Sequence, residues 1–238
     1  MRKVQFQDIG RVSYGTAWDF QTELFTETVD LKLANRKHPD TAQETSDHFL
    51  FVEHPPVFTL GKSGKMEHLL VDQEQLEKDG FEFFPVNRGG DITYHGPGQI
   101  VGYPIIDLDH YFTDIHKYLR YLEEVIISTL ADYGLKAGRS DGETGVWLDE
   151  GTPFARKMCA MGVKASRWTT MHGFALNVNA DLGHFDYIVP CGISDKKVTS
   201  LHIELGREVD LQEVKDKIKF YFQKQFDCQF IPTRHPFK

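Results

Sequence analysis

The sequence contains three cysteines, and the neighbours of Cys191 set it apart from the other two. Pro190 and Gly192 flank Cys191, which predicts a sharp turn that presents its thiol to a cleft. Backbone N–H groups on such a turn could stabilise the oxyanion that forms when a thioester is attacked. Cys159 lies in an apolar run and Cys228 has no polar neighbours of note, and buried cysteines of this kind are usually inert. Cys191 is therefore the best candidate for a nucleophile.

A cysteine nucleophile needs a group that favours its thiolate form, since the free thiol is mostly protonated near neutral pH. Five side chains could serve: His54, His95, His172, Lys157 and Lys164. Lys157 precedes the apolar run MCAMGV, so we expect its stem to be partly buried and its ammonium to be a strong local charge. The alternative for each of the five is an ordinary hydrogen-bonded or solvated side chain, and spacing alone does not choose among them.

The segment Arg88–Gln99, RGGDITYHGPGQ, has four glycines and one proline in twelve residues. Such a loop allows the backbone to approach a ligand closely. Its spacing is neither that of a P-loop nor GxGxxG, and no Lys-Ser or Lys-Thr follows, which argues against nucleotide phosphate binding. Two interpretations remain: a ligand-binding loop, or a rigid turn between two strands.

Apolar spacing predicts the elements that must position these residues. Helices are expected over about 15–35, over about 113–133 with Gly134 as the terminating residue, and from Asp210, where Glu213 completes a capping-box pattern. Strands are expected at 48–54, 99–108, 144–148, 158–166 and 172–179, the last two as an antiparallel pair. The order predicts an α/β (α+β) fold with a mixed sheet flanked by helices. No linker is visible, so a single domain over 1–238 is expected.

Composition limits the class of protein. The 238 residues are 40% hydrophobic, which is enough for a substantial core, and the net charge of -8 argues against nucleic-acid binding. The first ten residues lack the apolar stretch of a signal peptide, and no run is long enough for a membrane helix. Without a CxxC pair, neither a disulfide framework nor a zinc site is expected. We therefore predict a cytoplasmic protein with reduced thiols and no metal.

Long motifs resemble one family, the lipoyl (octanoyl) transferases. They are EHPPVFTLG (53–61), RGGDITYHGPGQIVGYPIIDL (88–108), TGVWL (144–148), RKMCAMGVKASRWTTMHGFALNVNADL (156–182) and IVPCGISDKKVTSL (188–201). The resemblance implies the fold of the catalytic domain shared by biotin and lipoate protein ligases. It also implies transfer of an octanoyl group from octanoyl-acyl carrier protein to a lysine of a lipoyl domain. The implied acceptors are the E2 subunits of 2-oxoacid dehydrogenases and the H protein of glycine cleavage, and no cofactor is implied.

The resemblance also assigns residues. Cys191 would carry the acyl group, and Lys157 would favour the thiolate and act as acid and base. The implied substrate contacts are Arg88, Gly89, Gly90, Asp91, Ile92, Thr93, Tyr94, His95, Ala160, Met161, Gly162, Gly173, Phe174 and Ala175. Because Cys159 is two residues from Lys157, adventitious acylation of its thiol is conceivable on sequence grounds.

Other interpretations fit parts of the sequence. An ATP-dependent lipoate or biotin ligase shares the fold but needs no cysteine, and the GRGRxG-type loop of biotin ligases is absent. A carrier-binding module without turnover, or a cysteine hydrolase, are further alternatives. For an acidic carrier protein, Arg88, Arg156, Lys164 and Arg167 are candidates for a local basic rim that the net charge does not provide, and the alternative is that they are ordinary solvated charges.

Overall fold

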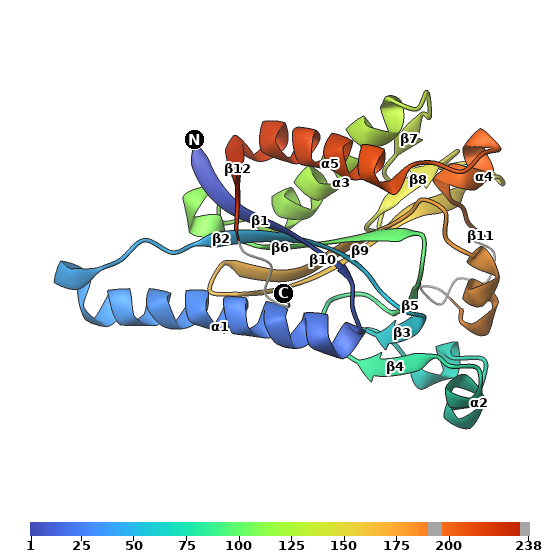
Figure 1. The fold of residues 1–238 in the computed structure, drawn as a ribbon, viewed down its shortest axis with the longest axis horizontal. Helices are drawn as coiled ribbons and strands as arrows, with labels where there is room; N and C mark the ends of the chain where they lie inside the picture. Colours follow the sequence, from blue (N-terminus) through green and yellow to red (C-terminus); the bar gives the residue numbers. More distant parts are fainter. Residues whose placement is uncertain (190–196, 234–238) are drawn as a thin grey trace.

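The computed structural model describes residues 1–189 and 197–233, which contain two β-sheets and five α-helices (Figure 1). The strands of the large sheet are β1 (Arg2–Arg11), β2 (Asp47–Glu53), β6 (Gln99–Ile105), β7 (Ala137–Gly138), β8 (Val146–Leu148), β9 (Arg156–Ser166), β10 (Thr169–Asn177), β11 (Lys197–Val198) and β12 (Cys228–Pro232). Their order is β12–β1–β2–β6–β10–β9–β8–β7, with β11 beside β9. β1 pairs in parallel with β2 and β12, and β11 with β9, while the other pairs are antiparallel. The expected mixed sheet is confirmed.

Helices cover both faces of this sheet. The long helix α1 (Tyr14–Lys37) packs on one face, and α3 (Ile115–Ala131) and α5 (Leu211–Phe226) pack on the other, as Figure 1 shows. Each face therefore has its own apolar cluster. Leu24 of α1 belongs to the first cluster, together with side chains of β2, β6 and β10, and Leu122 of α3 belongs to the second.

Side-chain caps fix where the helices begin. Ser13, Asp114 and Asp210 each accept a hydrogen bond from a backbone N–H in the first turn of α1, α3 and α5, respectively. These bonds satisfy donors that have no partner within the helix. The capping box expected at Asp210 forms only in part, because the Glu213 carboxylate accepts a hydrogen bond from the Tyr133 hydroxyl (3.0 Å).

A small sheet lies beside the N-terminal end of α1 (Figure 1). It has the order β4 (Glu82–Pro85), β3 (Val57–Leu60), β5 (Ile92–His95), and the short helix α2 (Gln73–Lys78) precedes β4. β5 is part of the glycine-rich segment, which is therefore a loop that leads into a strand. This arrangement places the loop against the large sheet.

The elements with strong periodicity are found where they are expected. The three predicted helices are α1, α3 and α5, and the five predicted strands are β2, β6, β8, β9 and β10, with β9 and β10 antiparallel. Gly134 has a φ of 77° in the turn after α3. The sequence did not predict β1, β12 or the small sheet, because these strands carry few apolar residues or are short. The Pro-Cys-Gly segment with Cys191, for which the sequence predicts a turn, lies outside the described residues.

Candidate active site

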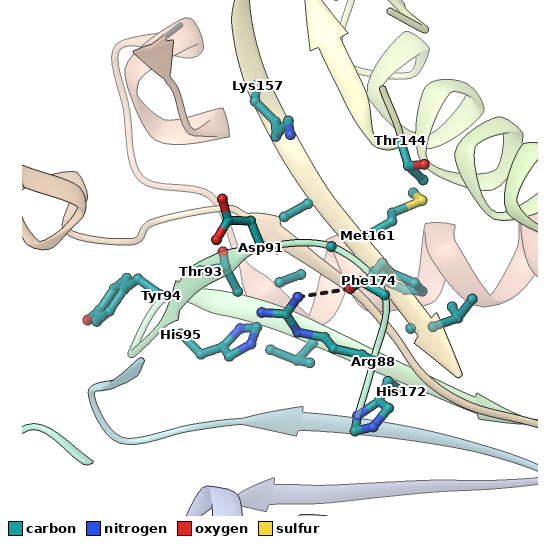
Figure 2. Close-up of a pocket in the computed structure, with 18 of the residues that line it drawn as sticks. Arg88, Asp91, Thr93, Tyr94, His95, Thr144, Lys157, Met161, His172 and Phe174 are labelled. Atoms are coloured by element: carbon teal, nitrogen blue, oxygen red, sulfur yellow. Dashed lines mark hydrogen bonds between the residues drawn. The ribbon is translucent and has the colours of Figure 1, made fainter. Parts of the chain in front are cut away.

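A cavity of about 350 Å³ opens where the glycine-rich loop meets β9 and β10 (Figure 2). Its volume falls in the range of small-molecule sites, about 300–1,000 Å³. Among the described residues, Lys157 and every implied substrate contact line it: residues 88–95, 160–162 and 173–175. Figure 2 shows Lys157 and Thr144 at one end and Arg88, His95 and His172 at the other. The fold thus gathers segments that are far apart in the sequence, from Tyr14 to Val198, around one cavity.

Glycines allow the backbones around the cavity to approach one another. A Cβ on Gly162 of β9 would lie 2.6 Å from the carbonyl oxygen of Gly89. A Cβ on Gly173 of β10 would lie 2.1 Å from the carbonyl oxygen of Gly102 on β6. Any other residue at these positions would push the loop from the sheet or separate the strands. The close approach is therefore set by the absence of side chains.

Hydrogen bonds tie the glycine-rich loop to both sheets. The Arg88 guanidinium donates to the carbonyl (2.7 Å) and hydroxyl (2.9 Å) oxygens of Thr59 on β3. The Gly89 N–H donates to the Val163 carbonyl (2.9 Å) on β9. Arg88 is buried, so its expected place in a basic surface rim is wrong. It is a structural anchor and part of the cavity wall.

Three buried histidines lie at this end of the cavity region. Burial lowers the pKa of His54 to about 4 and that of His172 to about 3, where Arg88 and Lys164 add repulsion. Burial also lowers the pKa of His95 well below its usual range. These side chains are therefore neutral at pH 7 and do not supply the positive charge that would stabilise a thiolate.

His172 has an unusual backbone for a strand residue. Its φ is 60°, in the left-handed region that non-glycine residues rarely adopt. Its N–H donates to the Gln21 side-chain oxygen of α1 (3.0 Å), and its Nε2 lies 2.9 Å from the Asn87 side-chain oxygen. Asn87, the residue before the glycine-rich loop, is thus anchored to β10. The contacts with Gln21 and Asn87 hold the strained backbone conformation of His172.

Lys157 is the cationic side chain at the other end. Its side chain is 12% exposed, as the expected partial burial of its stem requires. Its Nζ lies 3.7 Å from Glu143 Oε2 and 4.5 Å from the centre of the Trp147 ring. Lys157 lies on β9, and Glu143 and Thr144 lie in the loop before β8. All three residues line the cavity.

Neither described cysteine is a candidate nucleophile. Cys159 is fully buried, its Sγ contacts the Ala160 carbonyl oxygen (3.6 Å), and burial raises its pKa well above the usual range. Burial likewise raises the pKa of Cys228 to about 12. A buried thiol with a raised pKa is unreactive, so we discard the adventitious acylation of Cys159. Cys191 lies outside the described residues.

The other members of the expected basic rim differ from one another. Arg156 donates to both carboxylate oxygens of Glu204 on α4 (Leu201–Leu205), at 2.6 Å each, so it is engaged in a structural ion pair. Arg167 lies in the turn between β9 and β10, ten residues beyond Lys157 (167 minus 157). Lys164 is half-buried, with its Nζ 4.5 Å from the Phe25 ring, and follows the lining residue Val163. For Lys164 and Arg167 a place in a basic rim stays a prediction.

Sequence patterns did not single out several lining residues. Ile115 and Leu119, one turn apart on α3, contribute to the apolar spacing that predicts this helix, and that spacing does not indicate a cavity contact. Glu143 precedes the TGVWL motif and carried no signal of its own. Tyr14, at the start of α1, lines the cavity because the small sheet packs against that end of the helix. Such placements depend on tertiary packing.

In residues 1–189 and 197–233, no three His, Cys, Asp or Glu side chains are grouped so that they could hold a metal ion. No helix in those ranges has the length and apolar character needed to span a membrane.

Known proteins are similar in sequence to this chain over nearly its full length. The lipoyl protein ligase A/B catalytic domain family matches residues 13–223. An octanoyltransferase of Flavobacterium johnsoniae is 62% identical over 231 residues, which cover 97% of this chain and 99% of the relative. An octanoyltransferase of Christiangramia forsetii is 61% identical, over 96% of this chain and 97% of the relative.

Solved structures share the fold at low sequence identity. A bipartite lipoate protein ligase from Thermoplasma acidophilum, solved in a study with its E2 lipoyl domain, has a TM-score of 0.68 at 17% identity. The match covers 98% of this chain and 86% of that one. A lipoate-protein ligase A bound with ATP also has a TM-score of 0.68, at 15% identity, and covers 98% of this chain and 88% of that one. These similarities concern the fold alone.

Proposed function

The chain belongs to the octanoyltransferases of the lipoyl protein ligase A/B catalytic family, and from this membership we propose its donor, its acceptor and its covalent route. It is an acyltransferase that acts in protein lipoylation. The proposed donor is octanoyl-acyl carrier protein. The proposed acceptors are lipoyl domains of 2-oxoacid dehydrogenase E2 subunits and of the glycine cleavage H protein. The octanoyl group passes through a thioester on Cys191.

One observation carries the covalent route. Lys157 is a largely buried ammonium in the wall of a cavity whose lining histidines, His95 and His172, are neutral, so it supplies the positive charge that a thiolate needs. Cys159 and Cys228 are buried thiols with raised pKa values, which leaves Cys191 as the candidate nucleophile of this chain. The Pro-Cys-Gly sequence around Cys191 favours an accessible turn.

The proposed reaction has two half-reactions. In the first, the Cys191 thiolate attacks the thioester carbonyl of the donor, and the phosphopantetheine thiolate leaves and takes up a proton, for which Lys157 is the proposed donor. In the second, the neutral amine of the acceptor lysine attacks the acyl-enzyme, the now neutral Lys157 takes up the proton that its nitrogen loses, and the Cys191 thiolate is released. Exchange between thioesters is nearly isoenergetic and the amide product is lower in free energy, so the reaction needs no ATP.

The cavity wall fits an alkyl chain. Apolar side chains such as Ile115, Leu119, Met161 and Phe174 line it, and the glycines bring the backbones close. Burying the seven CH₂ and CH₃ groups of an octanoyl chain contributes roughly 5–6 kcal/mol, at about 0.8 kcal/mol each, before ordering costs. Differences in acyl chain length should therefore change the binding free energy measurably.

The second candidate is an ATP-dependent ligase, since a ligase bound with ATP has the same fold. Such an enzyme activates a free acid as an adenylate and has no need of Cys191. The two candidates thus differ in the covalent state of the protein and in the requirement for ATP.

Intact-mass spectrometry separates the two candidates. The protein is mixed with octanoyl-acyl carrier protein without ATP, and an apo lipoyl domain is then added. We expect a gain of one octanoyl group that moves to the lipoyl domain and does not form in Cys191→Ala, whereas Cys159→Ala should still form it. Transfer only with ATP and free octanoate would reject the covalent route and favour a ligase.

A further inference from the structure

The loop between β7 and β8 is fastened to α3 by a buried carboxylate. Glu123 is fully buried, and its Oε1 accepts a hydrogen bond from the Gly145 N–H (3.0 Å). Its Oε2 accepts from Arg120 (2.7 Å) and Arg139 (3.0 Å). A buried carboxylate with both oxygens hydrogen-bonded is a rigid anchor, because each hydrogen bond takes the place of one to water and fixes the orientation of the carboxylate. The position of Gly145 is therefore defined by α3.

Gly145 in turn brings the loop against β9. Its φ is 125°, which side chains rarely allow, and a Cβ there would lie 2.6 Å from the Cys159 carbonyl oxygen. The same Cβ would lie 3.6 Å from Cε of Lys157. The absence of a side chain at Gly145 thus lets the loop lie close to the stem of Lys157, and Glu143, two residues before Gly145, lies near the end of that side chain.

The Lys157 ammonium lies between a carboxylate and an indole. Glu143 Oε2 is 3.7 Å away and the Trp147 ring centre 4.5 Å away. The Lys157 and Glu143 side chains are only 12% and 16% exposed, so solvent screens their attraction less than it would at the surface. An ammonium over an aromatic face gains further electrostatic stabilisation.

We propose that Glu143 is a positioning residue, which holds the Lys157 ammonium in the cavity wall and which Glu123 places through Gly145. The inference rests on the proposed function in one respect only, the role of Lys157 beside a cysteine. Its geometric part concerns Lys157 alone and can be tested without any transfer activity.

This arrangement has a specific consequence for the two half-reactions. While Cys191 is a thiolate, the thiolate is a second anion that attracts the ammonium. In the acyl-enzyme the sulfur is neutral and Lys157 has given its proton to the leaving thiol, so Glu143 is the neighbouring anion that favours the return of a proton to Lys157 when the acceptor amine attacks. Removing the charge of Glu143 should therefore slow discharge of the acyl-enzyme more than its formation.

The test compares Glu143→Gln, Glu143→Asp and a matched control, Glu124→Gln. Glu124 pairs with Arg139 (2.6 Å) and is 41% exposed on α3, so its replacement removes a nearby carboxylate that does not contact Lys157. Single-turnover mass spectrometry follows acylation by octanoyl-acyl carrier protein and then discharge onto an apo lipoyl domain. For Glu143→Gln we expect discharge to slow about tenfold, with a much smaller effect on acylation. Glu143→Asp should restore part of the rate, and Glu124→Gln should match the wild type.

A second measurement addresses the position of the side chain directly. Limited labelling with an amine-reactive anhydride, read by peptide mass spectrometry, reports how readily Lys157 reacts. We expect its labelling rate to rise severalfold in Glu143→Gln and to stay unchanged in Glu124→Gln. Unchanged labelling in Glu143→Gln would overturn the proposal, as would an equal slowing of both half-reactions with a lowered melting temperature. If the wild type takes up no octanoyl group, the proposed function fails, but the labelling still decides the role of Glu143.

Discussion

Gly162 on β9 lies directly beneath Gly89 of the glycine-rich loop, so closely that a Cβ on Gly162 would be 2.6 Å from the Gly89 carbonyl oxygen. The Arg88 side chain, whose Cδ would be 3.1 Å from the same Cβ, covers the contact. Since Arg88 is buried and bonded to Thr59, the neighbouring groups have little room to yield. The contact therefore sets the separation between the loop and the floor of the cavity.

Gly162→Ala should displace the loop and impair octanoyl transfer. Overpacking at a contact of this kind costs about 1–3 kcal/mol of stability. We expect a lower melting temperature and a fall of at least about tenfold in kcat/KM with the octanoyl donor. Gly138→Ala on β7 is the control, because a Cβ there meets no atom within 4 Å. Wild-type kinetics in Gly162→Ala would show that the loop moves freely.

The buried histidines predict a loss of stability in mild acid. The pKa of His54 is lowered to about 4 and that of His172 to about 3 in the folded protein, against about 6.5 in an unfolded chain. As the pH falls below about 6.5, the unfolded chain takes up protons that the folded protein does not, so each histidine removes about 1.4 kcal/mol per pH unit. The loss of stability is absent above about pH 6.5 and grows with falling pH until the pKa of the folded protein is reached.

Urea unfolding at about pH 7, 6 and 5 measures this dependence. His54→Gln should be less stable than the wild type at pH 7, because His54 bonds the Val12 carbonyl and the Tyr103 hydroxyl. Its free energy of unfolding should nevertheless fall less steeply with decreasing pH. The slope should be smaller by about 1.4 kcal/mol per pH unit, which corresponds to one proton. Identical slopes for the two proteins would mean that His54 does not stay neutral in the folded state.

Lys164 is expected to affect the use of a carrier protein more than the chemistry. It follows the lining residue Val163 on β9, its Nζ lies over the Phe25 ring of α1, and we predict that it meets an acidic carrier. We expect Lys164→Ala to lower kcat/KM for octanoyl-acyl carrier protein about three- to tenfold at low salt, with the effect shrinking as salt rises. A small octanoyl thioester should be used as before.

The control for Lys164 is Lys37→Ala. Lys37 is exposed at the last turn of α1, 23 residues beyond the cavity residue Tyr14 (37 minus 14), which is roughly 35 Å along a helix. Its loss changes the net charge by the same amount without altering the mouth of the cavity. Equal losses on carrier and small thioester in Lys164→Ala would assign Lys164 to the cavity itself.

The sequence by itself determined the elements with a clear period and the segments that line the cavity. Apolar residues at helical spacing predict α1, α3 and α5, and short apolar runs between Gly and Pro predict β2, β6, β9 and β10, because these patterns reflect local backbone geometry. The buried, inert character of Cys159 also followed from its apolar neighbours. The long motifs contain residues 88–95, 160–162 and 173–175, which line the cavity.

Only the tertiary structure decided contacts between distant segments. The parallel pairing of β1 with β12, the left-handed backbone of His172 and the approach of Glu143 to Lys157 have no local signature. Arg88 is the clearest case, since a charge that was expected at the surface is buried by its bonds to β3. Such features arise because burial and charge pairing depend on partners that the chain brings together only when it folds.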